Sequence, residues 1–340
     1  MKQLNLLAED SRLERLTELG DPLTKVATLV DWEMFRPVLD SAFQIEAKGP
    51  GGRPSMDRVM MFKVVMLQQW YNIADDSTEY AINDRLSFQR FLGLTLDDKV
   101  VDAKTIWAFK EHLKNTGADK LLFQLFTQQM ETAGVITKTG TLVDATFVEV
   151  PVGRNTRKEN KEIKEGKTPE DWSEAKKAQK DTDAKWTKKN NKNYFGYKNH
   201  AKVDKDSKMI ISFEVTPANV HDSQIIEYLI EPDDKAVWAD SAYSGNEIKQ
   251  KLKSINPNIE INIIKKAYRN RPLTEKDKKA NHLMSKVRCR VEHPFGHIAK
   301  AMNGMATRAI GLARTTRDIS FKNLAYNVQR YVSLSKLSKI

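Results

Sequence analysis

The chain has 340 residues and a formal net charge of +11, and 40% of it is hydrophobic, with 13 Phe, 9 Tyr and 6 Trp. This apolar content is enough for a folded core and excludes a disordered tail, while the length predicts two domains or one large one. The positive charge favours a polyanionic partner such as nucleic acid, because Lys and Arg that meet phosphates release condensed counterions. A basic protein without such a partner is the plainer alternative.

The cellular compartment is indicated by three expected absences, namely of disulfides, of a signal peptide and of a membrane-spanning stretch. The only cysteine, Cys289, cannot form an internal disulfide or build a cysteine-based zinc site, which fits a reducing compartment. The first ten residues turn acidic too early for a signal peptide. The most apolar stretch, 59–67, carries Lys63 and is far shorter than the roughly 20 residues that span a bilayer. We therefore expect a soluble cytoplasmic protein with no membrane partner.

The first part of the chain, 1–135, predicts helices. They are expected over 56–72, from Asp76 or Ser77 to a stop at Gly93, from a cap at Asp102 to a stop at Gly117, and over 118–132. Helices joined by tight turns form a helix-turn-helix in some proteins and are only packing units in others, and spacing leaves both open. The segment 48–53 is either a flexible joint or a basic loop that contacts DNA.

After Gly134 the pattern changes to strands. Apolar strands are expected over 141–150, 194–204, 209–216, 235–240 and 259–265, with helices over 223–229, 245–255 and from about 275 onward. Three antiparallel strands followed by alternating strands and helices are what an RNase H-like α/β domain needs. The predicted fold is therefore a mixed sheet flanked by helices over 136–340, preceded by an all-helical region.

A highly charged stretch at 151–192 interrupts this order. It carries 13 Lys and Arg from 154 to 192 against 8 acids between 159 and 183. A solvated loop or exposed helix and an insertion that touches DNA are equally good interpretations.

Two acids lie at the ends of predicted strands. Asp144 stands inside the apolar run 142–147, and Asp240 directly follows the strand at 235–239. An acid in such a place is expensive to bury unless it is paired or bound to metal, although Asp240 alone could equally cap a turn. In the expected fold these two strands are neighbours, so the two carboxylates should lie together and suit a hard divalent ion.

A third acid is expected on a late helix. Glu292 and Arg288 are four residues apart, so they can share a helix face, and an ordinary surface salt bridge explains that spacing too. Lys286 and Arg290 add positive charge suited to phosphates. Pro294 predicts a kink, or a helix start directly after the acid.

Several blocks, in order, resemble the DDE transposases of bacterial insertion sequences, in the group named after insertion sequence five. The matching blocks are 52–54, 61–63, 67–69, 84–88, 91–94, Asp144-Ala145-Thr146, 194–200, 220–223, 238–243 and 288–296. Each block is weak alone, whereas the ordered set covers nearly the whole chain. The intervals of 96 residues between Asp144 and Asp240 and of 52 between Asp240 and Glu292 leave no room in the second for a large inserted β-domain.

The resemblance implies a metal-dependent enzyme that cuts DNA at the ends of an insertion sequence and joins them to target DNA. Asp144, Asp240 and Glu292 would hold Mg²⁺ or Mn²⁺, with two ions per site. The partners would be double-stranded DNA, as terminal inverted repeats and target, and further copies of the chain in a homodimer or larger assembly. The wider signature has a Lys seven positions after the Glu, where this chain has Ala299, so an anchoring role for Lys300 is open.

Other side chains have two interpretations each. Lys198 and His200 alternate on one strand and could contact DNA, orient a ligand carboxylate or form a cross-strand pair on a solvated face. The pair His293 and His297 resembles metal ligands but lacks a third nitrogen or sulfur ligand nearby. The list of expected DNA-contacting residues is Lys198, His200, Lys286, Arg288, Arg290 and Lys300. Trp186 and Tyr243 could stack on an unpaired base or simply pack in a core, and His221-Asp222 is better explained as a capped turn.

Two other functions fit the same residues. A domesticated transposase could bind DNA as a catalytically silent regulator, and a different RNase H-like nuclease could cut hybrids or junctions. The presence of all three acids argues against the first, and joining of a 3′-OH to target DNA would separate the second.

Overall fold

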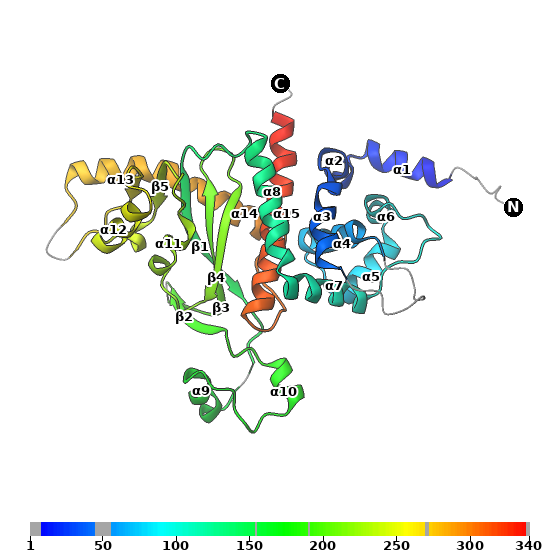
Figure 1. Cartoon of the computed structure of the whole chain (residues 1–340), viewed down its shortest axis with the longest axis horizontal. Helices are drawn as coiled ribbons and strands as arrows, with labels where there is room; N and C mark the ends of the chain where they lie inside the picture. The colour runs from blue at the N-terminus through cyan, green and yellow to red at the C-terminus, as the bar shows by residue number, and fades with distance from the viewer. Residues whose placement is uncertain (1–7, 45–55, 154, 190, 269–271, 338–340) are drawn as a thin grey trace. The chain divides into compact units, whose positions relative to one another are not determined.

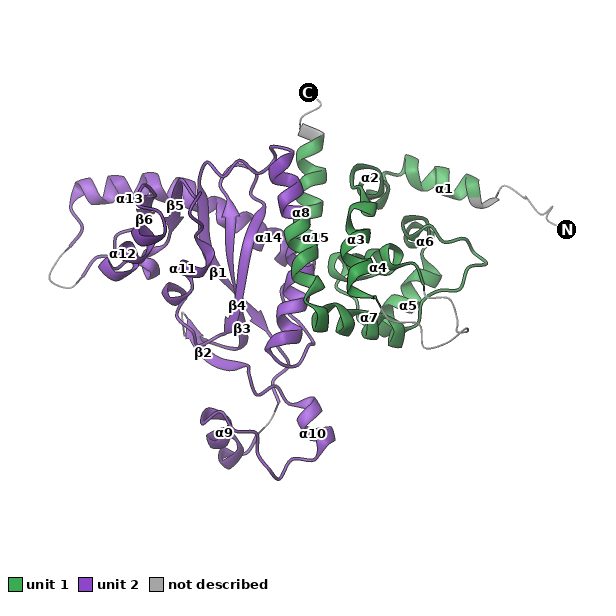
Figure 2. Ribbon diagram, viewed as in Figure 1, with its two compact units in different colours: residues 1–125, 324–340 green, residues 126–323 purple. Residues whose placement is uncertain are grey.

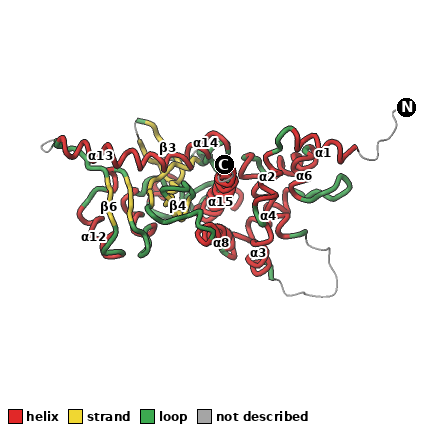
Figure 3. Tube along the Cα trace, turned by 90° about the horizontal axis from the view of Figure 1, so that it is seen from above, coloured by secondary structure: helices red, strands yellow, loops and turns green. Residues whose placement is uncertain are grey.

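The computed structural model describes residues 8–44, 56–153, 155–189, 191–268 and 272–337. It contains two compact units, residues 1–125 with 324–340 and residues 126–323 (Figure 2). Strands occur in the second unit, and the described part of the first consists of helices and loops (Figure 3). No helix in the described ranges is long and apolar enough to cross a membrane. The predicted loop at 48–53 lies outside the described residues.

The first unit packs its helices around an aromatic core. Trp32, Phe62, Trp70 and Phe91 meet edge to face, with ring centroids 5.4–6.4 Å apart, and such pairs add stabilisation beyond the apolar area they bury. Trp70 Nε1 donates to the carbonyl of Ala325, which fastens the end of the last helix to this core. The elements are α1 (Ala8–Glu18), α2 (Pro22–Leu29), η1 (Trp32–Phe35), α3 (Arg36–Ala42), α4 (Arg58–Tyr71), α5 (Asp75–Asp84), α6 (Leu86–Leu92), α7 (Ala103–Thr116), the start of α8 (Ala118–Thr132) and the end of α15 (Leu312–Leu337).

Caps and stops explain where these helices begin and end. Asp102 accepts the backbone N–H of Thr105 at the start of α7, and Gly117 closes that helix with φ +70°. The helix predicted from Asp76 to Gly93 is wrong as a single element. It is divided into α5 and α6 at Arg85, whose backbone is extended at φ −111° and ψ 108° and whose guanidinium lies over the Phe88 ring.

The second unit is built on a six-stranded mixed sheet. Its strands are β1 (Thr141–Glu149), β2 (Lys185–Lys189), β3 (Lys192–Asp204), β4 (Ile210–Pro217), β5 (Ala236–Ala239) and β6 (Glu260–Ile263), in the order β2-β3-β1-β5-β6 with β4 also paired to β3 (Figure 1). β1, β3 and β4 pair antiparallel, whereas β1, β5 and β6 run parallel. The predicted neighbourhood of the first and fourth apolar strands is confirmed, because β1 pairs with β5.

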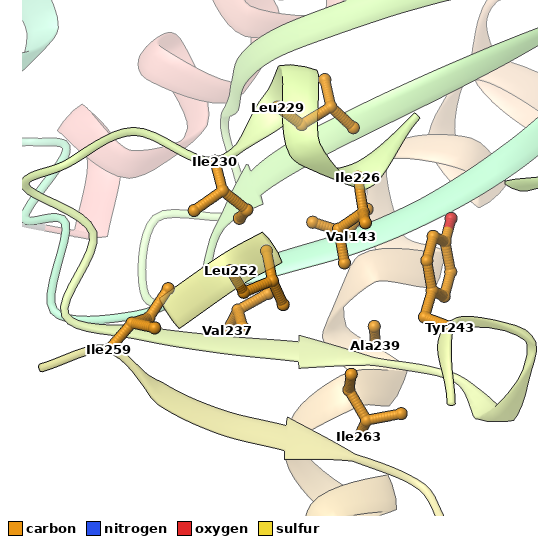
Figure 4. Packing of buried hydrophobic residues seen from close by; sticks show 10 residues of the cluster. All are labelled: Val143, Ile226, Leu229, Ile230, Val237, Ala239, Tyr243, Leu252, Ile259 and Ile263. Carbon is orange, nitrogen blue, oxygen red and sulfur yellow. The ribbon is translucent and has the colours of Figure 1, made fainter. Parts of the chain in front are cut away.

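Alternate residues of β1 enter two different cores. Val143 packs with side chains of β5, β6 and the helices α11 (Ile226–Leu229) and α12 (Asn246–Ile255), as Figure 4 shows. Val148 packs instead with Tyr197, Val215 and Ile319 of α15. Burial on both sides of the sheet explains why the sequence of β1 is almost continuously apolar, and it fixes the register that places Asp144.

The remaining elements of this unit are η2 (Asp222–Gln224), η3 (Ser241–Tyr243), α13 (Glu275–Arg288), η4 (Cys289–Val291) and α14 (Glu292–Ala301). The charged stretch at 151–192 contains β2 and two short helices, α9 (Arg157–Lys164) and α10 (Glu174–Gln179). It has its own small core, in which Trp172 is 3% exposed and donates from Nε1 to Glu159 at 2.7 Å. This segment can fold with few aliphatic residues because Trp172 and the capping residue Glu159 supply the contacts of its core.

Candidate active site

The register of β1 and β5 brings two carboxylates together at the end of the sheet. Thr141 pairs with Val237 and Leu142 with Trp238. Two residues further along each strand are Asp144 and Asp240. Continued past the last paired residues, this register carries the two acids to neighbouring positions, and the charge of Asp240 acts on Asp144.

Both carboxylates are held by backbone N–H groups. Asp144 Oδ1 accepts from Ala145 N at 2.8 Å, and Asp240 Oδ1 accepts from Ala242 N at 2.8 Å as it caps η3. The capping role considered for Asp240 is therefore present. It uses one carboxylate oxygen and leaves the other for a further ligand.

The electrostatics of this pair favour a bound cation. Burial raises the pKa of Asp144 above its usual value, and the nearby charge of Asp240 raises it further, while the N–H of Ala145 and the guanidinium of Arg288 act in the opposite direction. Two neighbouring carboxylates, of which Asp144 is partly shielded from water, attract a cation because the cation relieves the repulsion between their charges.

Arg288 connects the first acid to the third. Its Nη1 donates to Asp144 Oδ2 at 3.0 Å and its Nη2 to Glu292 Oε1 at 3.4 Å. Arg288 is the last residue of α13 and Glu292 the first of α14, so the expected single helix is interrupted by the 3-10 turn η4. Pro294 lies in the first turn of α14, where its missing N–H breaks no helical bond. Of the kink and the helix start considered for Pro294, the structure shows a helix start, and it lies at Glu292 itself.

The donor set fits a hard divalent ion, but the three acids do not converge. Carboxylate oxygens are the ligands that Mg²⁺ and Mn²⁺ prefer. Glu292 is 65% exposed at its side chain and reaches the Asp144–Asp240 pair through Arg288. Within the described ranges, no group of three or more His, Cys, Asp and Glu side chains is arranged to hold a metal ion. The structure therefore brings the carboxylates of Asp144 and Asp240 near each other and leaves Glu292 at their margin.

Lys198 and His200 lie on β3 beside this site, but neither faces open solvent. Lys198 Nζ donates to Asp222 Oδ1 at 2.8 Å and to the carbonyl of Val220 at 2.7 Å. His200 is fully buried, its Nε2 is 2.9 Å from Thr216 Oγ1, and burial lowers its pKa to about 4. A buried neutral imidazole cannot contact a phosphate, so the direct contact with DNA predicted for His200 is wrong. His200 can affect a ligand only through the side chains around it.

The other predicted DNA-contacting residues lie on α13, η4 and α14. Lys286 and Lys300 are exposed, whereas Arg290 is 3.3 Å from the carbonyl of Lys205 and 3.6 Å from Asp206. The rings of His293 and His297 stack with centroids 6.4 Å apart.

The two aromatic candidates differ in exposure. Trp186 is 57% exposed and packs on Phe195, while Tyr243 is 1% exposed and belongs to the core around Val143 (Figure 4). The Tyr243 hydroxyl has no hydrogen-bond partner among the described residues, and burial together with the charges of Asp222, Asp144 and Asp240 raises its pKa. Of the two roles that the sequence left open for Tyr243, the structure shows packing in a core.

Two family models match the chain. Residues 136–328, more than half of it, match the model described as transposase DDE domain, and residues 11–112 match the one described as transposase domain (DUF772). A solved structure, titled as the piggyBac transposase synaptic complex with hairpin DNA, is 11% identical over 91% of this chain and 75% of that chain, with a TM-score of 0.45. The assignment rests on the sequence models. The chain belongs to the DDE transposases, a family of metal-dependent enzymes.

Proposed function

We propose that this transposase cuts DNA at the ends of an insertion sequence and joins the freed ends to target DNA, with Asp144, Asp240 and Glu292 as its catalytic acids. The observation that supports the proposal most is the pairing of β1 with β5, which carries Asp144 inside one strand and Asp240 directly after the other. Their shared position gives one site with two carboxylates, partly shielded from water and backed by Arg288.

Each residue has a role in this proposal. Asp144 and Asp240 would hold the divalent ions, Mg²⁺ or Mn²⁺, and Glu292 would complete the ligand set after it leaves the guanidinium of Arg288. Arg288 keeps the Asp144 carboxylate oriented and ionised. Two such ions would supply activation of the attacking oxygen and stabilisation of the leaving one. No side chain acts as nucleophile, since water attacks first and the freed 3′-OH then attacks a target phosphodiester.

The rest of the chain is assigned by position. The helical region 1–135 would bind the terminal inverted repeats, and 136–340 would carry catalysis, with the structured insertion at 151–192 close to DNA. Pairing of two element ends requires a homodimer or a larger assembly. We place the protein in the bacterial cytoplasm and in the group named after insertion sequence five, on the ordered blocks quoted above.

The test is incubation of the purified protein with Mg²⁺ or Mn²⁺ and DNA that carries its own element's ends, scored for nicking and strand joining. Asp144→Asn, Asp240→Asn and Glu292→Gln should each abolish both products and leave DNA binding nearly intact. Full cleavage by one variant would remove that residue from the site. Tight binding with no cleavage by the unmodified protein would favour a silent regulator, and nicking without joining would favour another RNase H-like nuclease.

A further inference from the structure

A pocket of about 270 Å³ opens next to the acids and is not used by the chemistry described above. Its wall begins at Ala145, the residue after Asp144, and ends at Asp222. We name it the hairpin pocket, because the β2–β3 hairpin forms one side of it. Its lining is Ala145, Thr146, Phe147, Thr187, Lys188, Lys189, Lys198 and Asn219 to Asp222.

The charges in the hairpin pocket favour an anion. Its only carboxylate, Asp222, is already paired with Lys198 at 2.8 Å. Lys188 and Lys189 are exposed, and neither lies within 4 Å of a carboxylate oxygen of the described residues, although the charge of Lys189 lowers the pKa of Asp144. Two ammonium groups are therefore left for an outside partner, and a phosphodiester is the partner that the adjoining carboxylate site would bring to this place.

The pocket also has an aromatic floor. Phe147 is half-buried and stacks on Tyr194 with centroids 4.2 Å apart and planes at 9°. The Nζ atoms of Lys189 and Lys198 are each 5.7 Å from the centre of the Phe147 ring. A ring flanked by cations is the combination with which proteins hold single nucleic-acid strands, because a base stacks on the ring and phosphates meet the cations.

Size selects one strand over two. Pockets for small ligands are about 300–1,000 Å³, so a volume of about 270 Å³ suits a single nucleotide. A duplex is too wide for such a space, since its major groove alone admits a whole α-helix.

We propose that the hairpin pocket binds an unpaired nucleotide of the DNA strand that passes the Asp144–Asp240 site. The base of this nucleotide stacks on the Phe147 ring, where it displaces the ammonium group of Lys189. The flanking phosphates then contact the ammonium groups of Lys188 and Lys189. This inference rests on the proposed function for the identity of the strand. It predicts that the protein prefers DNA with a frayed or overhanging end to fully paired DNA.

The experiment compares two fluorescent probes by anisotropy, a short blunt duplex and the same duplex extended by a few unpaired thymidines. The unmodified full chain should bind the extended probe on the order of ten-fold more tightly, within the range known for one stacked base. Phe147→Leu keeps an apolar side chain but no ring, and should abolish this preference without changing affinity for the blunt duplex. Phe147→Tyr keeps the ring and should retain it.

The lysines are tested through salt dependence. Lys188→Gln with Lys189→Gln should lower the slope of log affinity against log salt on the extended probe by about 1.4, for two single-strand phosphate contacts. The matched control is Lys235→Gln with Lys249→Gln, two exposed lysines outside both the pocket and the charged insertion. A smaller effect in the control supports the pocket, whereas an equal effect in both pairs overturns it.

Binding and cleavage separate this inference from the proposed function. Asp240→Asn should abolish cleavage and keep the preference for the extended probe. An unchanged preference in Phe147→Leu, alongside normal cleavage by the unmodified protein, would overturn the pocket and leave the catalytic proposal standing. A preference that depends on Phe147 in a protein that never cleaves would support the pocket and count against the catalytic proposal alone.

Discussion

Arg288 provides the sharpest test of the electrostatics at the acids. Replacing Arg288 with Gln removes the contact from Nη1 to Asp144 at 3.0 Å and the contact to Glu292 at 3.4 Å. The first joins two side chains that are 20% and 22% exposed, so it falls in the class of charge-assisted hydrogen bonds that contribute about 1.5–3 kcal/mol. The second involves a Glu292 that is 65% exposed and contributes about 0.3–0.5 kcal/mol.

The expected loss in free energy of unfolding is therefore about 2 kcal/mol, measured without metal near neutral pH. For a unit of this size each kcal/mol lowers Tm by about 2–4 °C, so Tm should fall by about 4–8 °C. Calorimetry or circular dichroism would measure it. Arg290→Gln is the matched control, since Arg290 is exposed and makes only long contacts at 3.3 and 3.6 Å. Its Tm should change by about 1–2 °C or less.

The pH dependence of the same variant carries a second check. Arg288 lowers the pKa of Asp144, which burial raises. Its contribution exists only while Asp144 is ionised, so the unmodified protein and Arg288→Gln should differ most above the pKa of Asp144 and converge as pH falls through it. A variant as stable as the unmodified protein, or no more affected than Arg290→Gln, would refute the argument that Arg288 holds this carboxylate.

Three further outcomes are expected from buried groups. Lys202→Met should lower the free energy of unfolding by about 3–5 kcal/mol, because Lys202 and its partner Asp234, 2.8 Å away, are both fully buried. The double variant Lys202→Met with Asp234→Asn should recover part of this loss in denaturant titrations, and no recovery would contradict the pairing. Tyr243→Phe should leave the unfolding free energy unchanged or higher by about 1 kcal/mol, because the lost hydroxyl is buried with no partner in the part of the chain that the structure describes; a marked loss would reveal a bond in the folded protein. Burial lowers the pKa of His200 to about 4, below the ordinary 6.5, so the folded state resists protonation and the free energy of unfolding should fall as pH drops from about 6.5 to 4. His200→Gln should flatten this part of the stability–pH profile, and an unchanged slope would exclude His200 as its source.

Much of the fold could be predicted because its local signals agree. Asp102 and Gly117 bracket α7 by capping chemistry that depends on neighbouring residues alone. The apolar runs of β1 and β5 predicted two neighbouring strands, one with an acid inside it and one followed by an acid, and their pairing is confirmed. The break at Arg85 could not be read locally, because the segment has helical composition throughout and the break brings Arg85 over the ring of Phe88.

The sequence by itself determined which chemistry is available, since residue types and ordered motifs name the acids, the basic side chains and the family. Only the tertiary structure decided which groups meet. It brought Asp144 near Asp240, set Arg288 between Asp144 and Glu292, and buried His200. It also brought Phe147 of β1 and Lys189 of β2 together in one pocket. Such contacts depend on strand register and on packing between distant segments, which a local pattern does not encode.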